Sequence, residues 1–195
     1  MLSHYTKRQQ EIINIAIDLM ARKGVQELTI KNLSQKIGIV ESAIYRHFKS
    51  KQDILLGILN IFKENKEEIF AAIEEVSSSP LSQLHILFNK RFEHFSKNPA
   101  VASVIFSEDF FRNDKRLSQM VYDIMQINQS IIIDIVKRGQ LAGEIRNDLQ
   151  AKQLSFILTG ALRLIVTQWR LSEFDFDLVA EGRNVWQTLE KMIKK

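Results

Sequence analysis

The sequence predicts an all-α protein of about nine helices, with an N-terminal helix-turn-helix unit followed by a larger helical bundle. Three observations support this fold class. Hydrophobic residues make up 45% of the chain, whereas prolines and glycines number only two and seven, so a helical core is favoured over loops. Apolar residues recur at helical spacing in successive segments. No segment shows the apolar–polar alternation of a half-buried strand.

The N-terminal helices are expected over about residues 6–23, 29–37 and 41–48. Glycines end the first two, because Gly24 and Gly38 can adopt the left-handed conformation that closes many helices. Thr29 is placed to cap the second helix. The apolar stripe of the first helix consists of Ile12, Ile15, Ala16, Leu19 and Met20.

The rest of the chain is expected to form longer helices. Ser50 and Asp53 have capping-box spacing and open the first of them, while Asn98-Pro99 marks a break. Asp148 is expected to open the penultimate helix. The expected helices cover about residues 51–76, 80–97, 100–107, a long stretch after 106–114 that ends near 142–143, then 148–171 and 177–194.

Composition excludes several classes of protein. Without cysteine, disulfides, thiolate nucleophiles and cysteine-based zinc or iron–sulfur sites are ruled out. The four histidines, at positions 4, 47, 85 and 94, are too scattered for a metal cluster, and no cofactor is expected. The G-x-S-x-G, H-E-x-x-H, P-loop and G-x-G-x-x-G motifs are missing, as is an E-x-x-H pair for a di-iron bundle. The chain is therefore not expected to be an enzyme.

The apolar segments predict a soluble, cytoplasmic protein without a membrane partner. The first ten residues are polar and basic and lack the apolar region of a secretory signal. The longest apolar stretch, near residues 154–169, is interrupted by Thr159 and Arg163, which disfavours a membrane span.

Positive charge is concentrated at the start of the chain. Residues 1–53 hold nine Lys/Arg and five Asp/Glu, whereas residues 54–195 hold eighteen of each, so the net charge of +4 belongs to the first quarter. A basic unit on a neutral body favours a polyanionic partner such as nucleic acid. Chance is the alternative explanation for an excess of this size.

The expected helix over residues 41–48 has the side-chain arrangement of a DNA-recognition helix. At about 100° per residue, Ile44 and Phe48 share one face, which must pack on the preceding helix. The opposite side carries Ser42, Ala43 and Arg46, and the two flanks carry Tyr45 and His47. A helix in a major groove needs a central ridge toward base edges and flanks toward the phosphate backbones.

Side-chain chemistry suggests a role for each of these residues. Arg46 can offer two parallel hydrogen bonds to guanine, Ser42 can donate or accept, and Ala43 can touch a thymine methyl group. Glu41 can accept from a cytosine amine, although capping the helix N-terminus is the interpretation that we favour. Phosphate contacts are expected from Tyr45, His47, Lys49 and Lys51. A helical hairpin with no DNA role is the alternative.

Residues 29–51 also carry a recognisable signature. The order Tyr45-Arg46-His47-Phe48-Lys49-Ser50-Lys51 fits the pattern Y-x-H-F-x-[SN]-K, with matching residues at Thr29, Leu33, Gly38-Ile39 and Ala43-Ile44. The segment resembles the DNA-binding domain of the TetR/AcrR family of bacterial transcriptional regulators. The resemblance adds Thr29 to the DNA-binding residues. It implies a helix-turn-helix domain over residues 1–52 and a ligand-binding and dimerisation domain over residues 53–195.

Three positions depart from the family pattern. Ser34 stands where alanine is common, and Ile37 replaces a usually smaller residue. Val40 replaces a common serine that would cap the recognition helix, so Glu41 or Ser42 is expected to act as the substitute cap.

The resemblance implies a homodimer, and the local sequence supports one. Between residues 154 and 169, apolar side chains fall on every face of the expected helix, as in a helix that is buried on both sides. Two helices from each subunit would form a four-helix interface, and the two recognition helices could read a palindromic operator. A helix buried wholly inside its own domain is the alternative. The expected interface residues are Leu154, Leu158, Leu162, Ile165, Trp169, Val185, Trp186 and Leu189.

The resemblance further implies a ligand, and the middle helices are rich in large apolar side chains that suit a small hydrophobic molecule. The expected pocket residues are Phe88, Phe92, Phe106, Phe110, Met120, Met125 and Phe156. Ordinary core packing is the alternative for most of them. Four further side chains either orient a polar head group or lie on the surface: His85, His94, Arg91 and Arg112.

Together these features imply a ligand-responsive transcriptional regulator, most simply a repressor, that binds double-stranded DNA as a homodimer. Movement of the long helix that begins at Lys51 would change the spacing of the recognition helices. A coupling free energy of ~1–3 kcal/mol would change DNA affinity by a factor between several-fold and about a hundredfold. A DNA-bound scaffold that acts through a protein partner, without a small-molecule inducer, is the alternative within the family.

Overall fold

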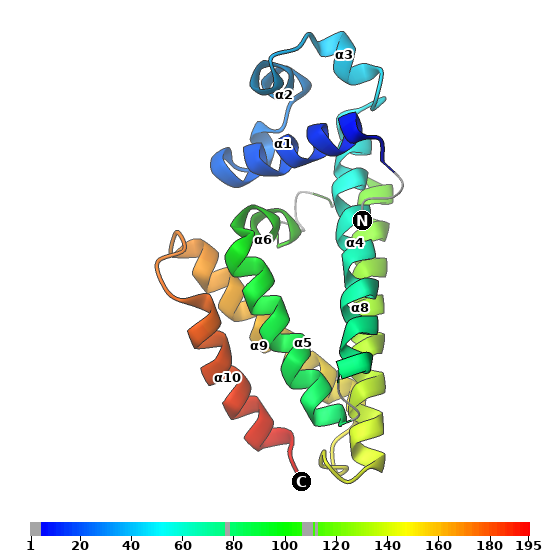
Figure 1. Ribbon diagram of the computed structural model, residues 1–195, viewed down its shortest axis with the longest axis vertical. Helices are drawn as coiled ribbons and strands as arrows, with labels where there is room; N and C mark the ends of the chain where they lie inside the picture. Colours follow the sequence, from blue (N-terminus) through cyan, green and yellow to red (C-terminus); the bar gives the residue numbers. More distant parts are fainter. Residues whose placement is uncertain (1–4, 77–78, 107–110, 112) are drawn as a thin grey trace. The chain divides into compact units, whose positions relative to one another are not determined.

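The computed structural model describes residues 5–195, apart from 77–78, 107–110 and 112. The described residues form nine α-helices and one short 3₁₀ helix, and they contain no strand (Figure 1). The elements are α1 (Lys7–Lys23), η1 (Val25–Glu27), α2 (Ile30–Ile37), α3 (Glu41–Tyr45), α4 (Lys51–Val76), α5 (Pro80–Lys97), α6 (Pro99–Ile105), α8 (Lys115–Leu141), α9 (Ala151–Leu171) and α10 (Leu178–Ile193). The predicted all-α fold is confirmed.

The chain divides into two compact units. The first unit comprises residues 1–65 and 100–123, and the second comprises residues 66–99 and 124–195. Helices α4 and α8 each contribute residues to both units, so neither unit is one continuous piece of sequence. The domain boundary that we expected after residue 52 falls within the first turn of α4.

The core of the first unit brings together α1, α2 and α3. Thr6 caps α1, and Gly24 ends it with a φ of 90°. An ion pair between Lys36 Nζ and Asp18 Oδ2, 2.6 Å long, links α2 to α1. Its hydrogen bond is the largest of the contacts that hold the pKa of Asp18 below its ordinary value. The buried apolar side chains of these helices and of the segments next to them are Ile12, Ile13, Ala16, Leu19, Met20, Leu28, Leu33, Ile44 and Phe48.

In the second unit, α5 packs against α10 and α9. The rings of Phe88 and Trp186 have centroids 5.0 Å apart. Phe92 lies so close to Gly182 that a Cβ atom at position 182 would be 2.4 Å from Cδ2 of the ring. Glycine at this position therefore allows α10 to approach α5 closely.

One glutamate in the second unit joins segments that are distant in sequence. Glu144 Oε2 accepts hydrogen bonds from Ser79 Oγ at 2.7 Å and from the Leu81 amide at 3.0 Å, which caps the start of α5. The Arg146 amide donates to the Ile193 carbonyl at 2.8 Å, and the Lys195 amide donates to the Glu144 carbonyl at 3.2 Å. The start of α5, the α8–α9 connection and the end of the chain are thereby tied together.

Two helix boundaries differ from those expected. Helix α3 ends at Tyr45 rather than near residue 48, although the backbone of Arg46 still has helical angles. Helix α9 begins at Ala151, because the carboxylate of Asp148 accepts a 2.7 Å hydrogen bond from Arg146 Nε and does not cap the helix. The pairing is strong enough to hold the pKa of Asp148 below its ordinary value.

Candidate nucleic-acid interface

Helices α2 and α3 form a helix-turn-helix around Gly38. The hydroxyl of Thr29 accepts from the Asn32 amide at 3.0 Å and caps α2, as expected. Gly38 ends α2 in the left-handed conformation with a φ of 78°. The amides of Gly38 and Ile39 both donate to the Ser34 carbonyl, at 2.9 and 3.0 Å, which closes the helix in the manner of a Schellman motif.

The inner face of α3 is apolar and fully packed. Ile44 has no exposed surface and Phe48 is 5% exposed, in agreement with the predicted core face of this helix. Ser34 is also buried, and its hydroxyl donates to the Lys31 carbonyl of its own helix at 2.9 Å. The serine found in place of the family's common alanine is therefore accommodated without an unpaired hydroxyl.

The outer side of α3 and the loop after it carry the residues expected to contact DNA. Glu41, Ser42, Tyr45, Arg46 and Lys49 are exposed, and Ala43, His47 and Lys51 are partly buried. Within the described chain, Arg46 and Lys49 have no ion-pair partner. Their N–H donors are available to external acceptors such as base edges and phosphates.

The N-terminus of α3 lacks a side-chain cap. Val40 occupies the N-cap position with extended backbone angles, makes no side-chain cap bond and is 68% exposed. The expectation that Glu41 or Ser42 would replace the missing hydroxyl is wrong, because neither side chain caps the helix. Glu41 lies in the first turn, where its negative charge favours the positive end of the helix dipole.

Sequence reasoning missed a contact between α1 and the end of α3. Gln9 completes a capping box with Thr6, and its Nε2 donates to the His47 carbonyl at 3.1 Å. The T-x-x-Q spacing at residues 6–9 was a usable signal for the capping box. The long-range bond to His47 has no local sequence signal, because the two residues are 38 positions apart.

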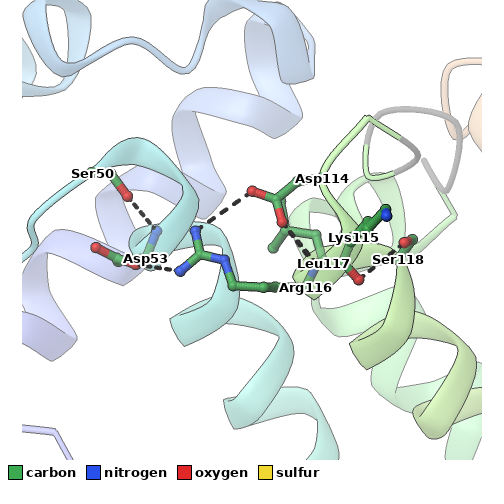
Figure 2. A network of polar contacts seen from close by, with 7 residues as sticks. All are labelled: Ser50, Asp53, Asp114, Lys115, Arg116, Leu117 and Ser118. Atoms are coloured by element: carbon green, nitrogen blue, oxygen red, sulfur yellow. Dashed lines mark hydrogen bonds and ion pairs between the residues drawn. The ribbon is translucent and has the colours of Figure 1, made fainter.

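A second missed cluster lies at the start of α4 (Figure 2). The Ser50 hydroxyl accepts from the Asp53 amide at 3.2 Å, which confirms the predicted cap. Arg116 of α8 lies 3.5 Å from Asp53 Oδ1 and 3.5 Å from Asp114 Oδ2. Asp114 also accepts from the backbone amides of Arg116 and Leu117, so it caps α8. Because the Arg116 side chain is 60% exposed, these pairs orient α4 and α8 more than they stabilise the fold.

Two family models match the chain. Residues 12–58 match the model described as bacterial regulatory proteins, tetR family, and residues 58–192 match the model described as YsiA-like protein, C-terminal region. The second match alone covers more than half of the 195 residues. The chain belongs to the TetR/AcrR family.

Relatives and solved structures agree with this membership. The fatty acid metabolism regulator protein of Bacillus subtilis is 23% identical to this TetR-family chain over 185 residues, covering 93% of each. The HTH-type transcriptional repressor KstR2 of Mycolicibacterium smegmatis is 27% identical over 152 residues, covering 75% of this chain and 72% of that relative. The crystal structure of FadR from Bacillus subtilis in complex with stearoyl-CoA shares the fold, with a TM-score of 0.76 and 24% identity over 92% of this chain and 96% of that chain.

This TetR-family protein is a DNA-binding transcriptional regulator and not an enzyme, as the sequence predicted. Among the described helices, none combines the length and apolar character needed to cross a bilayer. Within the same residues, histidine, aspartate and glutamate side chains form no group of three that could hold a metal ion.

The side chains expected to line a ligand pocket differ in burial and belong to both units of this TetR-family structure. Phe88 and Phe92 are buried against α10 and act as core, while Met125 and Phe156 are 46% and 58% exposed. Phe106 and Met120 are partly buried and belong to the first unit, whereas the other four belong to the second. The seventh, Phe110, and also Arg112, lie outside the described residues.

The residues expected at the dimer interface lie on the inner sides of α9 and α10. The buried ones are Leu154, Leu158, Ile165, Trp169, Trp186 and Leu189, and the partly buried ones are Leu162 and Val185. The exposed apolar side chains of α9 are instead Phe156, Ile157, Leu164 and Leu171. Side chains that are already buried within one chain offer little surface to a second, and the expected interface stays a prediction.

Proposed function

We propose that this regulator is a repressor that binds a palindromic operator as a homodimer and responds to a small hydrophobic ligand. The observation that carries the proposal is the outer side of α3, where Arg46 is exposed and lacks an ion-pair partner in the described chain. A two-fold related pair of such helices reads half-sites separated by ~34 Å or a multiple of it.

An exposed apolar stripe on α9 supports the dimer. Phe156, Ile157 and Leu164 are 58%, 46% and 60% exposed, and they lie on one helical face with Gly160. A Cβ atom at Gly160 would meet nothing within 4 Å, so the backbone there is open to close approach by another helix. An apolar stripe of this kind around a small residue suits a self-complementary contact between two copies.

The relatives support a hydrophobic ligand. One is named as a fatty acid metabolism regulator, and one solved structure of shared fold contains stearoyl-CoA. Helix α4 follows the helix-turn-helix directly and continues into the second unit, so displacement of α4 by a ligand would move the recognition helix. A coupling free energy of ~1–3 kcal/mol would suffice for regulation.

Substitution of Arg46 tests the DNA-binding assignment. We expect Arg46→Ala to weaken binding to the selected operator by about 1–3 kcal/mol and to relax base preference at one position in each half-site. Selection from a random DNA library, followed by titration of the winning site, measures both effects. Lys97→Ala is the matched control, because it removes one exposed positive charge from the second unit. An Arg46→Ala protein with unchanged base preference would refute the role of this residue.

A further inference from the structure

In the second unit, Arg91 of α5 contacts Asn128 of α8, and both lie between buried apolar side chains of their own helices, a set that we call the apolar seam. On α5, Leu87 and Phe95 are four residues before and after Arg91, and both are buried. On α8, Ile124 and Ile132 flank Asn128 at the same spacing and are buried as well. Because residues four apart share a helical face, Arg91 and Asn128 both project into a row of apolar side chains.

Arg91 and Asn128 form a polar pair inside this seam. Nη2 of Arg91 donates a 2.7 Å hydrogen bond to Oδ1 of Asn128. An amide oxygen is neutral, so the bond satisfies one of the five N–H donors of the guanidinium and leaves its charge uncompensated. Asn128 therefore holds the guanidinium in place without neutralising it.

No carboxylate in the described part of the chain lies within ion-pair distance of Arg91. Burial lowers the pKa of Arg91 to about 10, which still leaves the group charged at neutral pH. The same charge acts on the neighbouring turn of α5, where burial and then Arg91 hold the pKa of His94 below its ordinary value. A buried cation without a counter-charge is unfavourable, because its lost hydration is not replaced.

Arg91 is partly rather than fully buried, so the residue keeps some accessible surface. External atoms can therefore reach it. A planar guanidinium with free N–H groups matches a carboxylate or a phosphate, each of which can accept two parallel hydrogen bonds. The apolar tail of the ligand follows from the proposed function, since the apolar side chains that flank Arg91 are already buried within the chain.

We propose that Arg91 binds the anionic head group of the regulatory ligand, with Asn128 as the positioning residue. The ligand class is then an amphipathic anion, with an apolar tail and a carboxylate or phosphate head. This inference rests on the proposed function, in which the protein responds to a small hydrophobic ligand, and it specifies the charge of that ligand.

The test compares three probes with the same tail. Dodecanoate carries a carboxylate, dodecanoyl-CoA carries its charge on phosphates, and dodecanamide is neutral. Each is titrated calorimetrically into the wild-type protein, into Arg91→Met and into Lys90→Met. Lys90 is the adjacent exposed cation on α5, so its substitution removes the same charge without touching the seam.

We expect one of the two anionic probes to bind the wild type, and Lys90→Met to bind it equally well. In Arg91→Met, its affinity should fall by about tenfold to a hundredfold, the range for hydrogen bonds to a charged group. Loss of dodecanoate binding identifies a carboxylate head, and loss of dodecanoyl-CoA binding identifies a phosphate head. Dodecanamide should bind the wild type weakly and be insensitive to Arg91→Met.

Two outcomes overturn the inference while leaving the proposed function intact. In one, the anionic probes bind Arg91→Met as tightly as wild type; in the other, dodecanamide binds wild type as tightly as dodecanoate and dodecanoyl-CoA do. If none of the probes binds the wild type, the amphipathic anion fails as the ligand class and the inference is overturned, whereas the DNA-binding part of the proposed function is tested separately by Arg46→Ala.

Discussion

Helices α3 and α9 differ in how burial and polarity are distributed around them. In α3 the buried side chain is Ile44 and the exposed ones include Ser42 and Tyr45, so packing and the proposed DNA contact lie on separate faces. In α9 both faces are apolar, since Leu158 has no exposed surface and Leu164 is 60% exposed. Where buried faces are apolar and exposed faces are polar, as in α3, the sequence alone separates structural from functional residues. Where both faces are apolar, as in α9, only the packing of neighbouring helices shows which face is buried.

The inner face of α9 provides the largest expected effect. Leu158→Ala should lower the free energy of unfolding by about 2–5 kcal/mol, because it leaves a cavity between α9 and its neighbours. Urea denaturation measures the change. Leu141→Ala, at a site 89% exposed near the end of α8, should stay within about 0.5 kcal/mol of wild type. Equal effects at the two sites would contradict the assignment of Leu158 to the core.

The outer face of α9 should respond in the opposite way. Leu164→Glu should weaken dimer formation by about 3 kcal/mol or more, since the proposed interface would bury an unpaired carboxylate, while the protomer stays folded. Sedimentation velocity reports the oligomeric state, and circular dichroism reports the helix content. Leu141→Glu is the control for adding a charge at an exposed leucine. A stable dimer of Leu164→Glu would refute the outer face of α9 as the dimer interface.

The uncapped start of α3 should give a smaller, stabilising effect. The backbone of Val40 already has the extended angles of an N-cap residue. Val40→Ser should therefore raise the free energy of unfolding by about 1 kcal/mol, because a hydroxyl can accept from a free amide of the first turn. Urea denaturation of Val40→Ala next to Val40→Ser separates the capping bond from the loss of the exposed valine. If Val40→Ser is no more stable than Val40→Ala, a hydroxyl at this position does not cap α3.

His94 in the second unit should give the smallest effect, which is a dependence of the free energy of unfolding on pH. His94 has a lowered pKa in the folded protein, caused first by burial and then by the charge of Arg91. The unfolded chain then binds the proton more readily, so stability should fall as the pH drops from about 7 through the lowered pKa of His94. His94→Gln should flatten this part of the profile in urea titrations at pH 7.5 and 5.5. An unchanged slope in the variant would assign the dependence to other groups.

Local signals predicted much of the fold. Gly24 and Gly38 end helices, and Ser50 caps α4, because these effects depend on residues within a turn of one another. Asp148 misled the prediction of where α9 begins, since its carboxylate accepts from Arg146 and the helix begins only at Ala151. The prediction of this helix boundary therefore failed because the side chain had two possible partners.

The candidate DNA-binding site could be predicted from the sequence because its signals are chemical and periodic. The contacts of Gln9 with His47 and of Arg116 with Asp53 could not be, since they join residues far apart in the chain. For Arg91, the sequence left open whether the side chain lies on the surface or orients the head group of a ligand. Its position on the apolar seam depends on how α5 meets α8, which no local pattern specifies.

The hydrogen bonds around Glu144 also constrain the order in which the protein can be completed during synthesis. The carboxylate cap of α5 requires a residue that leaves the ribosome 65 positions after Ser79. The backbone bonds to Ile193 and Lys195 require almost the whole chain. The second unit is thus completed late in synthesis, and a nascent chain that stops before residue 144 would hold α5 with the Ser79 cap alone.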